Sequence, residues 1–427
     1  MRPNVILLLF LIVSLSSIVV GVSTGPQINC PDAVLHDDPF AISVTGLVPG
    51  VVVTLRTELY SGSGTIWRSE AQIHADANGV IDLEKNVPVG GPWNEPDILG
   101  PFWTLQNTKE KTNDSSLYDN SDQTIAMIQV RDGDKTLAQK LVVLRNRDIG
   151  VSTVEVRNNA VSGTFYSLSS TKRMAAVIVL SGSEGGVPRA EAALVASHGH
   201  PTLALAYFGF DKLPTDLERI PVETVDRAVS WLSTQPGVDP NHIVVMGGSK
   251  GAELALLAAS LNKHIAGVIA FAPSSVVYEG IGSSTASVSS WTYKDVDIPF
   301  ASYVHNDTYT KSHRLIDLYD PTYGAAPPKS RIAVEKISGP ILLLSGRADL
   351  LWPSGRMANE IATRIKNNGF KFELTNLQFD DVGHAVARIP LRPTADSVRL
   401  GGSARSIAHA NIESWRAIVS FLAKLEK

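Results

Sequence analysis

The segment HIVVMGGSKGAELALLAAS, His242 to Ser260, constrains the fold of this chain more than any other part of the sequence. It opens with a short apolar run, passes through glycines around a serine and a lysine, and ends in a run rich in alanine and leucine. The first run is typical of a buried strand and the last of a helix. The turn between them, Gly247 to Gly251, fits the pattern G-x-S-x-G of a serine held at a sharp strand-to-helix turn. The sequence therefore predicts an α/β domain in which Ser249 is presented where a strand ends.

The chain from residue 151 to 427 repeats this alternation of apolar runs and helical stretches. The apolar runs are AAVIVLSG, PTLALAYF, HIVVMGG, AGVIAFAPS, GPILLLSG and FELTNLQF, and the helical stretches include VETVDRAVSWLST, GRMANEIATRIKNNG and the terminal IAHANIESWRAIVSFLAKL. Continuous apolar runs linked by helices indicate parallel strands covered on both faces. We therefore predict a mostly parallel sheet flanked by helices in this part of the chain.

The part of the chain before residue 151 follows a different period. Apolar and polar residues alternate in FAISVTGL, VVVTLRTEL, IWRSEAQIHADANGVIDL and QTIAMIQVRDGDKTLAQKLVVLR. The dipeptides Asn78-Gly79 and Asp132-Gly133 lie inside the last two segments, where they indicate hairpin turns. Short alternating strands joined by such turns predict an all-β sandwich of the immunoglobulin type over residues 27–150.

The first 25 residues form a separate signal. Arg2 precedes an apolar run from Val5 to Val20, and small residues follow that run. This order is that of a secretory signal peptide. A membrane anchor is the alternative, but the run is short for a span and no basic stop follows it. We therefore expect a secreted or lumenal protein without a stable membrane span after cleavage, or a membrane-anchored one if the leader is retained.

Composition argues against several kinds of partner and cofactor. The net charge is −4 and no long basic run occurs, so we expect no nucleic-acid partner. His198 and His200 form the motif HGH, but no matching cluster of Cys, His or Glu accompanies it, so we expect neither a metal nor another cofactor. Cys30 is the single cysteine, which excludes an intrachain disulfide.

Ser249 is a candidate nucleophile, and the sequence offers partners for it. A serine hydroxyl is a weak nucleophile without a base, and the order along chains with this turn is serine, then acid, then histidine. Asp349 follows the predicted strand GPILLLSG, and His384 follows FELTNLQF. Both residues therefore lie at carboxyl ends of strands, where loops carry the chemistry of open α/β sheets. We predict a catalytic triad of Ser249, Asp349 and His384.

Other acids and histidines are weaker candidates for the triad. Asp380 and Asp381 are alternative acids, but they lie three and four residues before His384 on the same loop and are poorly placed to orient its ring. His409 lies on the terminal helix and is expected to be structural.

Two backbone N–H groups are expected to bind the oxyanion. One belongs to Lys250, directly after the serine and at the start of a helix. The other should come from the loop SGSEGG after the predicted strand AAVIVL, where either Ser183 or Glu184 would supply it.

These segments together resemble the acyl-CoA thioesterase and bile acid-CoA:amino acid N-acyltransferase family. The similarity runs from about residue 30 to the end, and its carriers include AYFGFDKLP, GGSKGAEL, VTGLVPGVVVTLRTEL, GPFWTL, ILLLSGRADLLWPS and ARSIAHANIESW. The resemblance implies a β-sandwich packed on an α/β-hydrolase domain, with a triad that acts on acyl thioesters of coenzyme A. Matched residue by residue, it implies Ser249 as nucleophile, Asp349 as acid and His384 as base.

The resemblance also bears on the reaction. The amino-acid-transferring members are similar with cysteine as nucleophile, so a serine favours hydrolysis of a small-molecule acyl thioester by water. An N-acyltransferase, a secreted carboxylesterase on non-CoA esters and a non-enzymatic binding protein are the alternatives. The secretory leader departs from the family's usual compartments, the cytosol, mitochondria and peroxisomes, and leaves the leaving group open. The insertion from Tyr278 to Lys336 is either a cap on the acyl pocket or ordinary surface structure.

Overall fold

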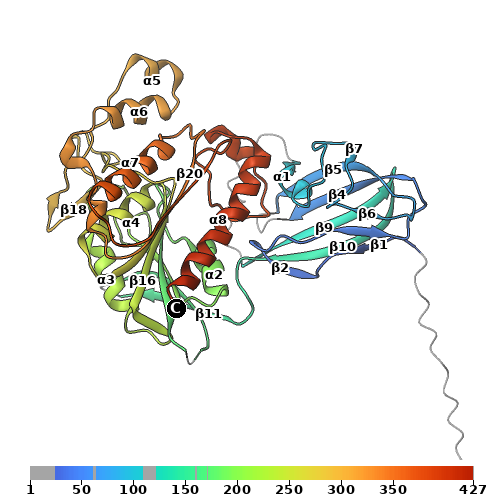
Figure 1. Cartoon of the computed structure of the whole chain (residues 1–427), viewed down its shortest axis with the longest axis horizontal. Helices are drawn as coiled ribbons and strands as arrows, with labels where there is room; N and C mark the ends of the chain where they lie inside the picture. The colour runs from blue at the N-terminus through green and yellow to red at the C-terminus, as the bar shows by residue number, and fades with distance from the viewer. Residues whose placement is uncertain (1–24, 61–63, 109–121, 159–160, 171, 427) are drawn as a thin grey trace, which may run out of the picture.

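The computed structural model describes residues 25–60, 64–108, 122–158, 161–170 and 172–426. Apart from Gly25, the predicted signal peptide lies outside the described residues. The described chain forms an all-β domain beside an α/β domain, as Figure 1 shows. Within the described ranges, none of the helices has both the length and the apolar character that crossing a membrane requires.

The all-β domain consists of two sheets. One has the strand order β1-β3-β6, and the other has the order β2-β10-β9-β4-β5-β7 with β8 paired to β5. The strands are β1 (Gln27–Asn29), β2 (Ala33–Leu35), β3 (Ser43–Thr45), β4 (Val52–Tyr60), β5 (Ile66–His74), β6 (Ile81–Asp82), β7 (Pro88–Gly90), β8 (Gln106–Asn107), β9 (Gln123–Asp132) and β10 (Lys135–Arg145), and α1 (Gly100–Trp103) is a single short helix. Along β5 every second residue from Trp67 to Ile73 is buried, so the period of two gives the strand one core-facing side.

The two predicted hairpin turns join strands in different ways. Asp132-Gly133 connects β9 and β10, which pair antiparallel, so this hairpin is confirmed. The hairpin predicted around Asn78-Gly79 is wrong, because β5 pairs with β4 and β7 whereas β6 pairs with β3 in the other sheet. The carboxylate of Asp76 accepts hydrogen bonds from the N–H groups of Asn78 and Val80 at this turn, and the chain changes sheets there.

The α/β domain is built on one eight-stranded sheet in the order β11-β12-β14-β13-β16-β17-β20-β21. Its strands are β11 (Val151–Arg157), β12 (Ser162–Leu168), β13 (Met174–Leu180), β14 (Thr202–Ala206), β16 (Val238–Gly248), β17 (Ile265–Phe271), β20 (Ile341–Gly346) and β21 (Leu374–Phe379). β11 and β12 pair antiparallel, β12 also pairs antiparallel with β14, and the remaining neighbours are parallel. The predicted mostly parallel sheet is therefore confirmed, and its order is that of the α/β-hydrolase fold.

Helices cover both faces of this sheet. They are α2 (Arg189–Ser197), α3 (Glu223–Leu232), α4 (Lys250–Leu261), α7 (Ser354–Asn367) and α8 (Ala404–Lys424). One buried cluster joins the sheet to α3, α4 and α7, and a second joins it to α2 and α8. Along β13, Ile178 belongs to the first cluster and its neighbours Val177 and Val179 belong to the second. Both faces of the strand are thus apolar, which explains why its sequence is a continuous apolar run.

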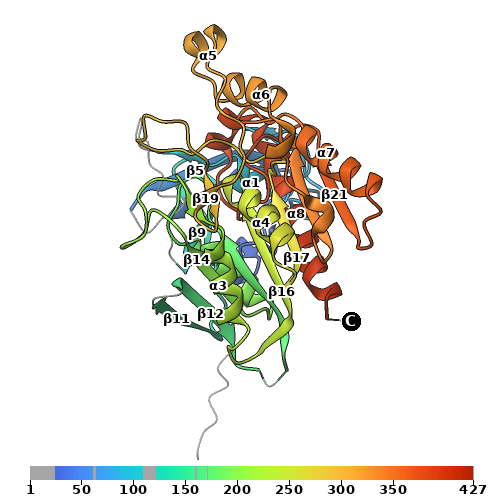
Figure 2. The same cartoon turned by 90° about the vertical axis from the view of Figure 1, so that its left-hand side faces the viewer.

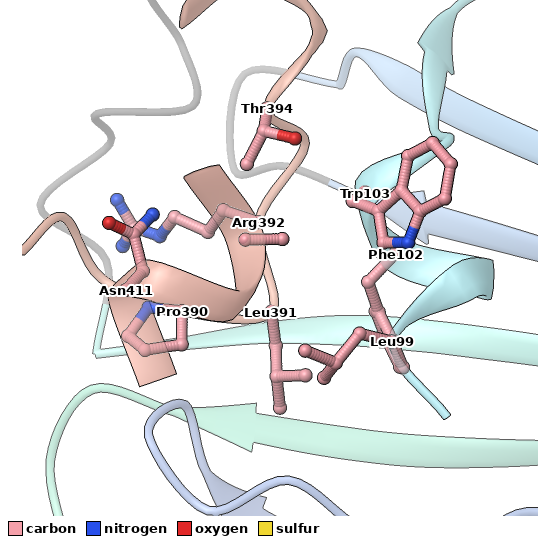
Figure 3. Close-up of a pocket in the computed structure, with 9 residues that line it drawn as sticks. Leu99, Phe102, Trp103, Pro390, Leu391, Arg392, Thr394 and Asn411 are labelled. Carbon is pink, nitrogen blue, oxygen red and sulfur yellow. The ribbon is translucent and has the colours of Figure 1, made fainter. Parts of the chain in front are cut away.

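The two domains share an apolar core. Leu391 and Ile412 of the α/β domain belong to the buried cluster of the sandwich. Figure 3 shows Leu391 beside Leu99 and Phe102 of the sandwich, at a small cavity between the domains. The domains are therefore packed through apolar side chains rather than only through a linker.

Polar contacts flank this shared core. His198 Nε2 lies 2.6 Å from an oxygen of Asp37, and His409 Nε2 lies 3.0 Å from an oxygen of Asp97. Both histidines belong to the α/β domain and both carboxylates to the sandwich. The contact with Asp97 is consistent with the structural role predicted for His409, because it links the terminal helix to the sandwich.

The insertion between β17 and β20 forms a separate projection. It contains β18 (Trp291–Tyr293), β19 (Val296–Asp297), α5 (Asp307–Ser312), α6 (Ile316–Gly324), η2 (Pro328–Ser330) and η3 (Val334–Lys336), and β18 pairs with β15 (Ile220–Pro221). Figures 1 and 2 show α5 and α6 extending outward from the α/β domain.

Candidate active site

Ser249 occupies the turn between β16 and α4. Its backbone has φ 55° and ψ −122°, a conformation that residues other than glycine rarely adopt. Its N–H donates to the carbonyl of Phe271 on the neighbouring strand at 3.0 Å. This strained backbone conformation places Ser249 between the end of β16 and the N-terminus of α4.

The flanking glycines allow this turn to pack closely. A Cβ atom at Gly247 would lie 2.6 Å from the carbonyl carbon of Gly251. A Cβ atom at Gly251 would lie 2.3 Å from the carbonyl oxygen of Ser181. Both distances are far below ordinary contact distances, so only glycine fits at these two positions of the G-x-S-x-G pattern.

Asp349 and His384 meet beyond the ends of two adjacent strands. Asp349 follows β20, which ends at Gly346, and His384 follows β21, which ends at Phe379. Both side chains are buried, and Nδ1 of His384 lies 2.9 Å from Oδ2 of Asp349. An N–H at Nδ1 donates to the carboxylate, which leaves Nε2 free to exchange a proton elsewhere.

The Asp349 carboxylate is held by further donors that sequence reasoning did not identify. Its Oδ1 accepts from the N–H groups of Leu351 and Trp352 at 2.8 and 3.2 Å, and Oδ2 accepts from the hydroxyl of Ser354 at 2.5 Å. The ring of Trp352 also packs edge-on against the imidazole of His384, with 5.5 Å between ring centroids. These contacts fix both the carboxylate and the imidazole.

The two alternative acids are engaged elsewhere. Asp380 is exposed and forms an ion pair with Arg347 at 2.5 Å. Asp381 accepts hydrogen bonds from Ser403 and Ser406, and these bonds lower the pKa of its carboxyl. Neither residue has a hydrogen bond to His384 among the contacts that the structure describes.

Ser249 and His384 line one cavity of about 470 Å³. Nε2 of His384 is buried and has no hydrogen-bond partner among the described residues. Apolar side chains from β13, the following loop and the end of β17 line part of the cavity: Val179, Leu180, Val187, Phe271 and Ala272. The cavity thus combines a hydroxyl and an unpartnered imidazole nitrogen with an apolar wall, which suits an acyl group.

Of the three residues predicted to supply an oxyanion N–H, only Glu184 is among the residues that line this cavity, and Lys250 directly follows the lining residue Ser249. Lys250 is the first residue of α4, so its N–H has no acceptor within the helix. Glu184 lines the cavity, and its carboxylate accepts from the N–H of Gly182 at 2.9 Å. Ser183 is exposed and is not among the residues that line the cavity.

The Lys250 side chain is turned into the protein. Its Nζ lies 2.8 Å from both carboxylate oxygens of Glu253, and both side chains are fully buried. Burial lowers the pKa of Lys250 and raises the pKa of Glu253. Glu253 also accepts from the indole N–H of Trp291 at 2.7 Å, which ties α4 to the insertion. The Lys250–Glu253 ion pair therefore stabilises the first turn of α4, the helix that follows Ser249.

Three arginines at this cavity were not identified from the sequence. Arg388, Arg392 and Arg399 line it, and all three follow His384 within one segment.

None of the described residues of the insertion is among those that line the cavity. The described part of the insertion therefore contributes no wall to this cavity, and the cap considered from the sequence is not formed by it here.

The HGH motif is accounted for by contacts within the protein. His198 contacts Asp37, and His200 is buried with its Nδ1 bonded to the carbonyl of Ala175 at 3.0 Å. Over the described ranges, no group of three or more His, Cys, Asp or Glu side chains could hold a metal ion.

Comparison with known proteins identifies relatives along most of the chain. Acyl-coenzyme A thioesterase 2, mitochondrial, of Mus musculus is 29% identical over 406 residues, which are 91% of this chain and 86% of that protein. Acyl-coenzyme A thioesterase 1 of Rattus norvegicus is also 29% identical over 406 residues, 91% of this chain and 93% of that protein. Among solved structures, an esterase from the archaeon Pyrobaculum calidifontis is 16% identical and covers 66% of this chain and 88% of its own, with a TM-score of 0.43.

Two family descriptions match the two halves of the chain. Residues 37–158 match the acyl-CoA thioester hydrolase/BAAT N-terminal region. Residues 220–426 match the BAAT/acyl-CoA thioester hydrolase C terminal region. Both regions occur here in the order in which the family combines them, on a chain whose relatives span nearly its whole length. The chain therefore belongs to the acyl-CoA thioester hydrolase/BAAT family.

Proposed function

We propose that the protein is a serine thioesterase that hydrolyses acyl-CoA thioesters to the free acid and coenzyme A. The observation that carries this proposal is the buried Asp349–His384 hydrogen bond of 2.9 Å, at a cavity that Ser249 shares with His384. The names of the relatives, which are acyl-coenzyme A thioesterases, support the substrate class.

In the first half of the reaction, Ser249 Oγ attacks the thioester carbonyl carbon while Nε2 of His384 takes the hydroxyl proton. Asp349 holds the Nδ1–H tautomer and stabilises the imidazolium that forms. The N–H of Lys250 and an N–H of the loop at Ser183 or Glu184 stabilise the oxyanion. The carbon–sulfur bond then breaks, and His384 returns its proton to the leaving sulfur.

In the second half, water attacks the acyl-serine ester. His384 removes a proton from the water as the new carbon–oxygen bond forms. The bond between the acyl carbon and Ser249 Oγ then breaks, and His384 returns the proton to the serine. The products are the free acid and the enzyme in its starting state.

The competing reactions use the same acyl-serine intermediate. An N-acyltransferase would pass the acyl group to an amine, and product analysis with and without glycine or taurine separates transfer from hydrolysis. A carboxylesterase would act equally on esters that lack coenzyme A. We favour hydrolysis because the proposed nucleophile is a serine, whereas the resemblance described above implies a cysteine nucleophile in the amino-acid-transferring members of the family.

The direct test is hydrolysis of acyl-CoAs of graded chain length and of nitrophenyl esters by wild type and Ser249→Ala. We expect the alanine variant to lose at least about 10³-fold in kcat. Ser260→Ala is the matched control. Ser260 lies on α4, the helix that follows Ser249, and its hydroxyl donates to the carbonyl of Leu257. Equal rates for wild type and Ser249→Ala would refute the assignment, and failure of a serine-directed fluorophosphonate to label Ser249 would favour a binding protein.

For the compartment we propose the secretory route, on the pattern of residues 1–25 alone. Mass analysis of the mature N-terminus of the expressed protein tests this. A chain that begins near residue 26 would support cleavage of a signal peptide, and a chain that retains its leader would support a membrane anchor.

A further inference from the structure

The cavity that holds Ser249 and His384 carries an uneven distribution of charge. Its charged lining residues, apart from His384, are the arginines Arg388, Arg392 and Arg399 and the glutamates Glu184 and Glu191. The glutamates belong to the loop after β13 and to α2, whereas the arginines all lie in the segment that follows His384. The cations at the cavity thus come from one chain segment and the carboxylates from another, in a protein whose net charge is −4.

We propose that Arg388, Arg392 and Arg399 form a subsite for the phosphate groups of the leaving group. The inference rests on the proposed function and extends it. The substrate is a thioester of a phosphate-bearing thiol, and these arginines select it over neutral esters. Coenzyme A has this chemistry, since its thiol arm ends in a diphosphate and a ribose phosphate. Guanidinium groups bind phosphate oxygens with paired, charge-assisted hydrogen bonds.

The position of the arginines relative to His384 favours the leaving group over the acyl chain. Nε2 of His384 must reach the sulfur to protonate it, so the thiol arm leaves the reaction centre on the side of that residue. Arg388 lies four residues after His384, and Arg399 lies on η4 (Ala395–Leu400). The apolar lining residues from β13 and the end of β17 lie outside the segment of the arginines, and they offer an acyl chain an apolar wall.

The backbone of the first arginine is fixed by the terminal helix. The N–H of Arg388 donates to Oδ1 of Asn411 at 3.1 Å, and its carbonyl accepts from the indole N–H of Trp415 at 3.1 Å. Both partners belong to α8. The segment thus has a defined path as it passes the cavity.

The sandwich orients the second arginine. A terminal nitrogen of Arg392 donates to Oδ1 of Asn146 at 3.3 Å. Leu391, its neighbour, is buried in the sandwich core, and in Figure 3 the Arg392 guanidinium extends away from Leu99 and Phe102. The N-terminal domain therefore takes part in placing a cation at the cavity of the other domain.

Arg399 differs from the other two in its exposure. Arg388 and Arg392 are half-buried, whereas Arg399 is exposed and lies at the rim. A phosphate at the end of a long thiol arm would meet the rim first. Arg399 is consequently the residue whose replacement should affect charge recognition with the smallest effect on folding.

A carboxylate at the end of the acyl chain is the competing anion. It would use the same guanidinium chemistry, but it would extend from the carbonyl on the side opposite to the sulfur. The two sources are separable, because a thioester of N-acetylcysteamine keeps the acyl group and the thioester but has no phosphate.

The experiment compares kcat/KM for the same acyl group on coenzyme A and on N-acetylcysteamine. We expect Arg399→Gln to lower the value for the acyl-CoA about tenfold and Arg388→Gln/Arg399→Gln about a hundredfold. Hydrolysis of the neutral thioester should change less than about twofold and reports that the site is intact. Arg416→Gln, at an exposed position of α8 that does not line the cavity, should change neither value.

Added salt should lower wild-type activity on the acyl-CoA and have little effect on the double variant. Equal losses on both thioesters, or no loss on the acyl-CoA, would overturn the proposal. Losses confined to a succinyl thioester of N-acetylcysteamine would assign the arginines to an acyl carboxylate instead.

A binding measurement separates this inference from the proposed function. Ser249→Ala protein should bind adenosine 3′,5′-bisphosphate, and Arg399→Gln in that background should weaken binding about tenfold. No binding, together with Ser249-dependent hydrolysis of the neutral thioester, would overturn the phosphate subsite and leave the thioesterase in place. Binding without hydrolysis of either thioester would support the subsite and contradict the proposed function.

Discussion

Nδ1 of His384 lies 2.9 Å from Oδ2 of Asp349, although the two residues are 35 positions apart in the sequence. They meet because β20 and β21 are parallel neighbours, so the loops that follow both strands leave the same edge of the sheet. Ser249 follows β16 at that edge as well.

The first prediction concerns the acid. Asp349→Asn should lower kcat by about 10³- to 10⁴-fold, because the amide stabilises the wrong imidazole tautomer and cannot stabilise the imidazolium. Asp380→Asn, at an exposed carboxylate near His384, should change kcat by less than about twofold. Steady-state rates on one acyl-CoA distinguish the two acids, and the reverse order of losses would reassign the triad.

The second prediction concerns the turn that holds the serine. Gly251→Ala should destabilise the protein by about 1–3 kcal/mol and lower kcat, because its Cβ would meet the carbonyl oxygen of Ser181 at 2.3 Å. Gly324→Ala is the control, since a Cβ there meets nothing within 4 Å. Denaturant unfolding and rates on the same preparations check this, and an unchanged Gly251→Ala enzyme would contradict it.

The third prediction concerns the buried ion pair behind the serine. Lys250→Met leaves the Glu253 carboxylate buried without its cation and should cost about 3–5 kcal/mol of unfolding free energy. Lys250→Met/Glu253→Gln should be more stable than that single variant, because the amide oxygen still accepts from Trp291 without a buried charge. A double variant as unstable as Lys250→Met would show that the charge is not the cause.

The fourth prediction concerns pH and the domain interface. His36 is buried, and Nδ1–H donates to the carbonyl of Pro390 at 2.9 Å across the interface. Burial, assisted by the nearby charge of Arg392, lowers the pKa of His36 from 6.5 to about 3. The unfolded chain therefore binds one more proton than the folded chain between these values, so this contribution to stability is complete above pH 6.5 and is lost as the pH falls toward 3.

His36→Gln isolates that contribution. The difference in unfolding free energy between wild type and variant should change by up to about 1.4 kcal/mol per pH unit below pH 6.5. Denaturant unfolding at pH 7.5, 6 and 5 measures it. Parallel stability curves for the two proteins over this range would contradict the assigned pKa.

Much of the fold and of the candidate site could be predicted because the relevant signals are local. The runs around Ser249, Asp349 and His384 each end a strand, and parallel order alone gathers such ends at one edge. The glycines of the turn are also recognisable in the sequence as part of the G-x-S-x-G pattern. The structure gives the physical reason for Gly251, since a Cβ atom there would lie 2.3 Å from the carbonyl oxygen of Ser181.

The features that were missed depend on pairing or on distant packing. An Asn-Gly dipeptide specifies a reversal of the chain, but β6 pairs with β3 rather than with β5 through contacts elsewhere in the sandwich. β11 is an edge strand with mostly exposed residues, so it lacks the apolar run that marks its neighbours. Ser354 can donate to Asp349 because α7 begins at Ser354. Arg392 is held at the cavity by a hydrogen bond to Asn146 of the sandwich.

The burial of Leu391 and Ile412 inside the sandwich has a consequence for how the molecule comes apart. Removal of the N-terminal domain would expose these two apolar side chains to solvent. It would also remove the contacts that hold the segment between His384 and α8, which carries Arg388, Arg392 and Arg399. A truncated chain should therefore aggregate, or lose the placement of these arginines, while its eight-stranded sheet is still folded. Because the two domains share this buried cluster, heating should unfold both of them in one transition.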